Sequence, residues 1–256
     1  MIRVVDISHH NPTPNFKKFK ETDTSVIIRC GYGSELTSQD DRNYKENINL
    51  ALFNDVPTSV YIYSYATDKS MAESEAKHML RLVEPYWGKI SSTLWLDIEE
   101  DEAKNTALTV FNAFRNYIKN NSNHNWNVGL YASENYFNTT KLCNVADDVP
   151  LWIAKYGAND GVAHTPPKLH NNKITSLWQF TSNGRQEGLQ GNCDISYCYN
   201  GNLFKKGGEP IMEIDTAIKK LVDKGVIKTP DYWYNAIKCV KYLDTLLINM
   251  ATSYTE

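Results

Sequence analysis

The stretch Thr93-Leu94-Trp95-Leu96-Asp97-Ile98-Glu99-Glu100 joins an apolar run directly to three acidic residues. Its first four residues are mostly apolar, which indicates a strand buried on both faces, as in a parallel sheet. Unpaired carboxylates are costly to bury, so we expect the junction at the end of a barrel strand, where the core opens into a cleft. Because side chains alternate along a strand, Asp97 and Glu99 point one way and Glu100 the other. This arrangement suits a general acid with a supporting carboxylate. The alternative is a loop that begins with solvated acids.

Strand and helix patterns alternate on both sides of this stretch. Strands are expected at 2–7, 25–31, 59–65, 93–96 and 127–132, and helices at 15–20, 40–54, 70–83 and 101–119. Alternation of this kind is typical of parallel βαβ units. After residue 132 the pattern changes, and 150–156, 174–180 and 194–199 read as strands with no convincing helix between them. Eight strands, of which the first five follow the strand–helix alternation, predict an α/β fold, a TIM-like irregular (β/α)5β3 barrel.

Acidic and aromatic residues gather at the expected strand ends. Asp6 ends the first strand, Asp97 and Glu99 end the fourth, and Asp194 lies at or near the boundary of the last. Active sites of such barrels lie at the carboxyl ends of the strands. Tyr61, Tyr63 and Tyr65 share one face of the third strand. Those nearest its end are expected to line the site, the alternative being a polar outer face against helices.

Composition excludes several functional classes. The chain has 256 residues, 41% of them hydrophobic, and a net charge of −3, so no nucleic-acid partner is predicted. No apolar run approaches the roughly 20 residues that span a membrane, and the N-terminus shows no secretory signal pattern. The five cysteines are scattered without a C-x-x-C pair, and His9-His10 has no further ligands at suitable spacing. We therefore predict no metal and no cofactor.

Five segments in order resemble the glycoside hydrolase family 25 lysozymes, the Chalaropsis-type muramidases common among phage endolysins. They are Asp6-Ile7-Ser8, Tyr61-x-Tyr63, Asp97-x-Glu99, Leu151-Trp152-Ile153-Ala154, and Trp178-Gln179-Phe180-Thr181-Ser182 followed by glycines and Asp194. The resemblance covers about residues 1–204. It departs from the family pattern at His9-His10-Asn11 and at Cys193, and neither departure removes a carboxylate.

The resemblance implies cleavage of the β-1,4 bond between N-acetylmuramic acid and N-acetylglucosamine in bacterial peptidoglycan, with net retention. Such chemistry needs a protonated acid and a second group that stabilises the oxocarbenium-like centre. Glu99 is the expected general acid/base, with its pKa raised by neighbouring acids such as Asp97. Asp97 would orient the substrate acetamido group, and Asp6 and Asp194 would shape the charge of the site. A nucleophilic Asp194 is the competing assignment. The candidates for stacking on sugars are Tyr32, Tyr61, Tyr63, Trp152 and Trp178.

The chain after the barrel has a different pattern. Residues 205–211 are expected to form a polar linker, and 212–256 a helical tail whose first helix ends at Gly225 and whose second begins at Thr229-Pro230. Two helices make a poor independent core, so we expect the tail to self-associate, to dock on the barrel, or both. The endolysin resemblance implies binding to the host cell wall. A helical extension that only stabilises the barrel is the alternative.

Codons for Lys205-Lys206-Gly207-Gly208-Glu209 can contain a purine-rich ribosome-binding sequence, with Met212 at a suitable distance for an internal start. A free copy of the tail would then join the full-length chain. The resemblance further implies synthesis in the host cytoplasm without a signal peptide, release through a holin pore, and host lysis. Two other functions are open: a non-catalytic glycan-binding barrel, which the four acids disfavour, and a chitinase-like glycosidase, which also ends a barrel strand in D-x-E.

Overall fold

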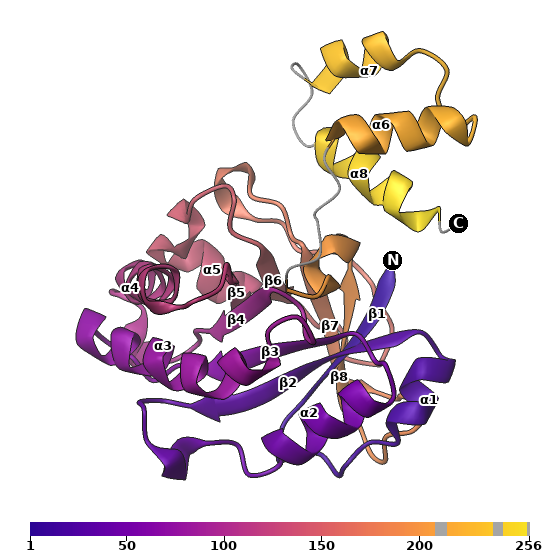
Figure 1. The fold of residues 1–256 in the computed structure, drawn as a ribbon. Coiled ribbons are helices and arrows are strands. Elements are labelled where there is room, and N and C mark those ends of the chain that lie inside the picture. The colour runs from indigo at the N-terminus through magenta and orange to yellow at the C-terminus, as the bar shows by residue number, and fades with distance from the viewer. Residues whose placement is uncertain (208–213, 238–242, 255–256) are drawn as a thin grey trace. The chain divides into compact units, whose positions relative to one another are not determined.

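The chain folds around a closed barrel of eight strands, seen in the computed structural model, which describes residues 1–207, 214–237 and 243–254 (Figure 1). The strands follow the chain in order around the barrel. The prediction of an eight-stranded α/β barrel is therefore confirmed. The strands are β1 Ile2–Ile7, β2 Thr24–Tyr32, β3 Thr58–Tyr63, β4 Thr93–Asp97, β5 Asn127–Ser133, β6 Leu151–Ala154, β7 Leu177–Gly184 and β8 Cys193–Cys198.

One α-helix follows each of the first five strands, and these helices pack against the outside of the barrel (Figure 1). They are α1 Phe16–Glu21, α2 Tyr44–Phe53, α3 Lys69–Val83, α4 Ala107–Asn121 and α5 Glu134–Thr139. The sequence pattern did not locate α5, which has only six residues. Short 3₁₀ helices complete the connections, at Thr37–Gln39, Glu84–Tyr86, Asp101–Ala103, Lys141–Asn144, His170–Asn172 and Gly201–Phe204. Asp101 therefore begins a 3₁₀ turn, and α4 starts six residues later than the acidic segment suggested.

The last strand runs against its neighbours. The pairs from β1–β2 to β6–β7 are parallel, whereas β8 is antiparallel to both β7 and β1. The amino end of β8 therefore lies at the same end of the barrel as the carboxyl ends of the other seven strands. In this register Asp194, near the start of β8, faces Asp6, near the end of β1.

Alternation along the strands separates two cores. Trp95 and Trp152 belong to a cluster inside the barrel, and Leu203 and Phe204 from the segment after β8 join it. Leu94, Leu96 and Ile98 belong to the larger cluster between the strands and the helices. On β4 the inward series Thr93, Trp95 therefore continues to Asp97, as the sequence pattern predicted.

The segment after β8 adds to the barrel edge. Ser92 N donates to Lys205 O at 2.9 Å, and Gly207 N donates to Ile90 O at 3.0 Å. Residues 205–207, which the sequence suggested as linker, thus pair with the residues that lead into β4. They belong to the same compact unit as the barrel.

The C-terminal residues form a second compact unit. Its described helices are α6 Ile214–Asp223, α7 Pro230–Ile237 and α8 Leu243–Ser253. Ala217, Ile218 and Leu221 on α6 pack with Ile227 and with Leu247 and Ala251 on α8. Gly225 has a φ of +69°, consistent with its expected place at the end of the first helix. The expected second helix corresponds to two described helices, and Met212 lies outside the described residues.

Across the described part of the chain, no helix is long and apolar enough to cross a membrane. The same residues contain no group of three or more His, Cys, Asp or Glu side chains placed to hold a metal ion.

Candidate active site

A pocket of about 310 Å³ opens at the end of the barrel where the first seven strands finish. All four acids chosen from the sequence line it, together with Tyr61, Tyr63 and Trp152. Seven further lining residues were not chosen from the sequence: Ser8, His10, Asn11, Arg29, Tyr131, Tyr156 and Gln179. The barrel thus collects acids from residue 6 to residue 194 around one cavity.

Asp6 and Asp194 form a cross-strand pair on one wall of the pocket. Gln179 Nε2 donates to Asp6 Oδ2 at 3.0 Å. Burial raises the pKa of Asp6 well above its ordinary value, and the charge of Asp194 adds to the shift. Burial also raises the pKa of Asp194 to about 6. Two neighbouring carboxyls in one buried site titrate as a pair, so they share a proton over part of the acid range.

Asp97, the last residue of β4, is buried more deeply than Glu99, with 6% of its surface exposed. Its pKa is raised well above the ordinary value, first by burial and then by the charges of Glu99 and Asp6. Its Oδ1 atom is buried and accepts no hydrogen bond from any residue that the structure describes. A buried acceptor without a donor is rare in proteins. This atom therefore suits an N–H or O–H donor that comes with a ligand.

Glu99 stands at the mouth of the pocket, where its side chain is exposed. Its pKa is nevertheless raised, first by desolvation from the surrounding side chains and then by the charges of Glu100 and Asp194. The sequence pointed to Asp97 as the neighbour responsible. In the structure the repulsion between these two acids acts mainly on the pKa of Asp97, the more deeply buried of the pair.

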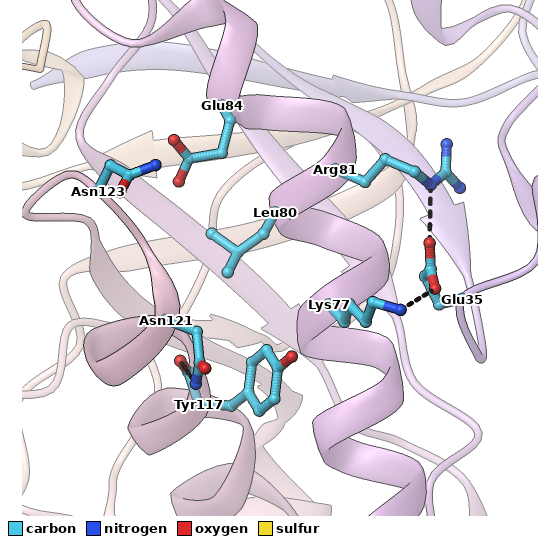
Figure 2. Close-up of a pocket in the computed structure, with 8 residues that line it drawn as sticks. All are labelled: Glu35, Lys77, Leu80, Arg81, Glu84, Tyr117, Asn121 and Asn123. Atoms are coloured by element: carbon cyan, nitrogen blue, oxygen red, sulfur yellow. Dashed lines mark hydrogen bonds and ion pairs between the residues drawn. The ribbon is translucent and has the colours of Figure 1, made fainter.

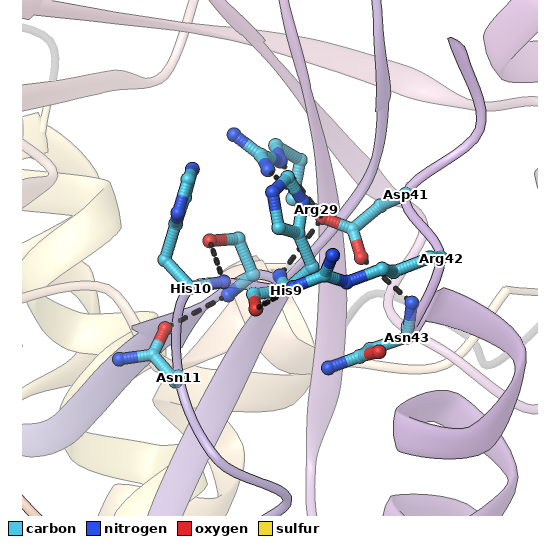
Figure 3. A network of polar contacts seen from close by, with 8 residues as sticks. His9, His10, Asn11, Arg29, Asp41, Arg42 and Asn43 are labelled. Atoms are coloured by element: carbon cyan, nitrogen blue, oxygen red, sulfur yellow. Dashed lines mark hydrogen bonds and ion pairs between the residues drawn. The ribbon is translucent and has the colours of Figure 1, made fainter. Parts of the chain in front are cut away.

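Arg29 brings the one guanidinium among the lining residues of this acidic pocket. Figure 3 shows how it is held: Arg29 Nε donates to Asp41 Oδ2 at 2.9 Å, and Arg29 Nη2 lies 2.6 Å from His9 Nδ1. Asp41 also accepts from the backbone N–H groups of His9 and Asn43. Burial opposes the charge of Asp41, but these hydrogen bonds and Arg29 hold its pKa below the ordinary value. Arg29 in turn lowers the pKa of Asp97, against the effects that raise it.

Aromatic side chains form the other wall. Trp152 meets Tyr61 and Tyr131 edge to face, with ring centroids 6.0 and 4.6 Å apart. The hydroxyls of Tyr131 and Tyr156 both donate to Gln179 Oε1, at 2.8 and 2.7 Å. Gln179 therefore turns its Nε2 donor toward Asp6. Tyr131, Tyr156 and Gln179, none of which was predicted as a site residue, thus form a hydrogen-bonded chain that ends on the predicted Asp6. Of the two tyrosines, only Tyr131 could have been noticed in the sequence, from its inward position on β5.

Two predicted aromatic residues lie elsewhere. Trp178 belongs to the cluster between the strands and the helices, and its Nε1 donates to Lys155 O at 2.9 Å. The neighbouring Gln179 is the residue of β7 that reaches the pocket. Tyr32 is also absent from the lining. It lies edge to face with Tyr65 at 6.2 Å, and the guanidinium carbon of Arg29 is 5.8 Å from its ring centre.

Asp194→Asn is expected to stabilise the protein above pH 7 and to leave its stability unchanged near pH 4. The pKa of Asp194 in the folded protein, about 6, lies above the ordinary 3.8. The folded state therefore binds the proton more tightly, and stability falls as the pH rises through this window. Removing the charge should recover on the order of 2 kcal/mol at pH 7.5.

Denaturant unfolding of both proteins at pH 4 and pH 7.5 measures this difference. Glu102→Gln, which changes an exposed acid outside the pocket, is the matched control and should show no gain. A gain for Asp194→Asn of the same size at both pH values would contradict the burial of its charge.

Several carboxyls with raised pKa values at the strand ends of an α/β barrel match the arrangement that glycoside hydrolases use, because bond cleavage in these enzymes uses paired carboxyl groups. The model of the glycosyl hydrolases family 25 matches residues 5–189. The chain belongs to this family.

Several solved structures are similar to the chain. The catalytic domain of endolysin Ply40 from bacteriophage P40 of Listeria monocytogenes is 28% identical, with a TM-score of 0.67 over 79% of this chain and 95% of that one. A bacterial lysozyme from Streptomyces coelicolor shares the fold at 19% identity, with a TM-score of 0.66 over 79% of this chain and 95% of that one. The CTP1L endolysin shares it at 23% identity, with a TM-score of 0.65 over 88% of this chain and 80% of that one. No curated protein sequence matches the chain.

Proposed function

We propose that the chain is a muramidase that hydrolyses the β-1,4 bond between N-acetylmuramic acid and N-acetylglucosamine in peptidoglycan. One observation carries this proposal: two acids two residues apart line one pocket in different environments. Asp97 is buried with an unpaired acceptor, whereas Glu99 stands at the mouth with a raised pKa. Environments that separate two carboxyls in this way are typical of acid/base assignments in glycosidases. Relatives described as an endolysin and as a lysozyme support the choice of substrate.

In the proposed mechanism Glu99 gives its proton to the leaving glycosidic oxygen. Asp97 Oδ1 accepts a hydrogen bond from the N–H of the 2-acetamido group on the sugar whose anomeric carbon is attacked. The acetamido oxygen then attacks the anomeric carbon, and the C–O bond breaks. Glu99, now a carboxylate, takes a proton from a water molecule. The oxygen of this water attacks the anomeric carbon from the face opposite to the acetamido oxygen and opens the cyclic intermediate. Two inversions at the same carbon retain the configuration overall. Asp6 and Asp194 set the negative charge beneath this centre. Direct attack by Asp194 is the competing assignment.

The raised pKa of Glu99 supports its role, because a general acid must hold its proton near the working pH. Tyr61, Tyr63 and Trp152 line the pocket and offer flat apolar faces with polar handles, which suit a pyranose ring. No cofactor enters the scheme. These features favour an enzyme over a non-catalytic glycan-binding barrel.

Reducing-end analysis of digested peptidoglycan tests the bond that is cut. Borohydride reduction of the products should convert muramic acid, and not glucosamine, to its alcohol. Glucosamine ends would refute the muramidase assignment while leaving a glycosidase, and the absence of new reducing ends would refute hydrolysis of the glycan altogether.

The domain division is part of the proposal: residues 1–204 as the catalytic (β/α)5β3 barrel and 212–256 as a helical tail that binds the cell wall or forms oligomers. Of the expected linker 205–211, residues 205–207 pair with the barrel edge, so the proposed linker is the remainder. The separate cluster of α6–α8 supports a distinct tail. As an endolysin-type enzyme the protein would be made in the cytoplasm of the host bacterium, leave it through a holin pore, and lyse the host.

An internal start at Met212 would supply free copies of the tail that assemble with the full-length chain. The CTP1L endolysin, one of the structural relatives, has its activity regulated by a secondary translation product. Synonymous codon changes at Gly207-Gly208 test this point. A small C-terminal product should be present before the change and absent after it.

A further inference from the structure

Helix α3 carries two ionisable side chains that are completely buried and lie outside the pocket. Glu75 and His78 both have 0% of their surface exposed, and they are one turn apart on the same helix. Ionisable side chains are rarely buried to this degree unless they are hydrogen-bonded. The partners of these two residues lie in the segments that follow β3 and β2, which are two of the strands that end at the pocket.

Glu75 holds the segment after β3. Ser64 Oγ donates to Glu75 Oε2 at 2.6 Å, and Tyr65 N donates to Glu75 Oε1 at 2.8 Å. Ala66 N in turn donates to Ser64 Oγ at 3.2 Å. Burial raises the pKa of Glu75 to about 7, although these hydrogen bonds counteract it. The carboxyl group therefore fixes three consecutive residues directly after Tyr63.

His78 holds the segment after β2. Its Nδ1 lies 3.0 Å from Gly33 O, and its Nε2 lies 2.9 Å from Asp40 Oδ1. The ring packs directly under β2, where a Cβ at Gly31 would lie 2.7 Å from its Cε1 atom. The same segment is therefore held at both of its ends, next to Tyr32 and before α2.

The outer side of α3 holds this segment as well (Figure 2). Lys77 Nζ lies 2.8 Å from Glu35 Oε2, and Arg81 Nε lies 3.3 Å from Glu35 Oε1. Ser74 Oγ accepts from Glu35 N at 3.1 Å. Together with His78, the α3 side chains Ser74, Lys77 and Arg81 thus hold the segment between β2 and α2.

The two segments place three tyrosine rings side by side. Tyr63 and Tyr65 have ring centroids 5.1 Å apart, and Tyr32 meets Tyr65 edge to face at 6.2 Å. We call Tyr32, Tyr63 and Tyr65 the tyrosine rim. Tyr63 lines the pocket, so the rim continues the pocket wall outward. Tyr65, at its outer end, is 47% exposed.

We propose that the tyrosine rim binds one further sugar ring of the glycan strand, beyond those in the pocket, and that Glu75 is a positioning residue that holds Tyr65 in place for it. A rigid group of aromatic faces with hydroxyl handles suits the apolar face and the polar edges of a pyranose. The inference rests on the proposed function for the identity of the glycan. It adds a binding site, gives Tyr65 a role outside the pocket lining, and adds one residue, Glu75, to which the sequence pattern did not point.

Steady-state kinetics on uncross-linked glycan strands of defined length test the binding site. Tyr65→Ala should raise the KM for long strands roughly threefold to tenfold, the range expected for one lost aromatic contact, with kcat unchanged. The KM for the shortest substrate that is cleaved should not change. Tyr65→Phe keeps the ring and should behave as the wild type does. An unchanged KM for long strands in Tyr65→Ala would overturn the binding site.

A double-mutant cycle tests the role of Glu75. Glu75→Gln should raise the KM for long strands in the same direction and leave kcat unchanged. The double variant with Tyr65→Ala should be no worse than Tyr65→Ala alone, because the two changes act through one contact. Leu82→Ala, a buried truncation on α3 away from the rim, controls for lost stability and should keep the wild-type KM. Additive effects, or an equal rise of KM in Leu82→Ala, would overturn the positioning role.

These outcomes are separate from the failure of the proposed function. If the chain is not a muramidase, the wild type itself will release no muramic acid ends from any strand. If the tyrosine rim binds no sugar, the wild type will cleave long strands and Tyr65→Ala will cleave them equally well.

Discussion

Glu99→Gln is expected to reduce the rate of glycan cleavage roughly 10²- to 10⁴-fold, the range for loss of a general acid/base. The amide has nearly the shape of the acid, but its N–H protons are not acidic enough to be transferred to the leaving oxygen. The KM should change little, because the side chain stands at the mouth of the pocket. Release of reducing ends from purified cell walls measures the rate, and clearing zones in zymograms give an independent readout.

Glu100→Gln is the matched control, because the two acids are neighbours in sequence and alike in chemistry. Tyr63 Oη donates to Glu100 Oε1 at 2.6 Å, and an amide oxygen at that position can still accept this bond. We expect the rate of Glu100→Gln to stay within about tenfold of the wild type, since a neutral hydrogen bond is weaker than one to a charged acceptor. Equal clearing by Glu99→Gln and the wild type would remove Glu99 from the mechanism.

Asp97→Asn is expected to lower the rate roughly 10²- to 10³-fold, the cost of removing one preorganised group at a developing charge. Its buried Oδ1 is the atom that would accept the acetamido N–H. The folded protein should not lose stability, because the substitution removes a carboxyl whose charge is opposed by burial and by Glu99. Rates and unfolding free energies measured on the same preparation separate the two effects.

A glycan with its 2-acetamido groups converted to free amines distinguishes the roles of Asp97 and Asp194. If the acetamido oxygen attacks the anomeric carbon, the wild type should not cleave this substrate at a measurable rate. Cleavage at the normal rate, with a larger loss in Asp194→Asn than in Asp97→Asn, would instead make Asp194 the nucleophile.

The sequence alone predicted those features of the site that follow from the pattern within a single strand or from the order of the strands. The inward direction of Asp97 follows from strand alternation, because Thr93 and Trp95 alternate with the outward Leu94 and Leu96. The gathering of Asp6, Asp97 and Glu99 follows from the rule that barrel strands end at one rim.

Features that depend on distant partners could not be predicted in this way. Arg29 lies within an ordinary apolar strand, and only the fold brings it to Asp41 and His9. On β7 the sequence Leu177-Trp178-Gln179-Phe180 gives no clear alternation, and the tryptophan was preferred for its ring, whereas Gln179 faces the pocket. The helix α5 is too short for a periodic pattern to show. Glu75 gave no signal, because a buried acid on a helix looks like a solvated one in sequence.

The pairing of β8 with β1 has a consequence for synthesis. Asp6 leaves the ribosome almost first and Asp194 nearly two hundred residues later, yet the two face each other across one ladder. Contacts between such distant residues form late in folding, because a large loop must close before they add any stability. A nascent chain therefore has no complete set of acids until its eighth strand emerges, and under the proposed function a truncated product that ends before β8 would not cleave the glycan.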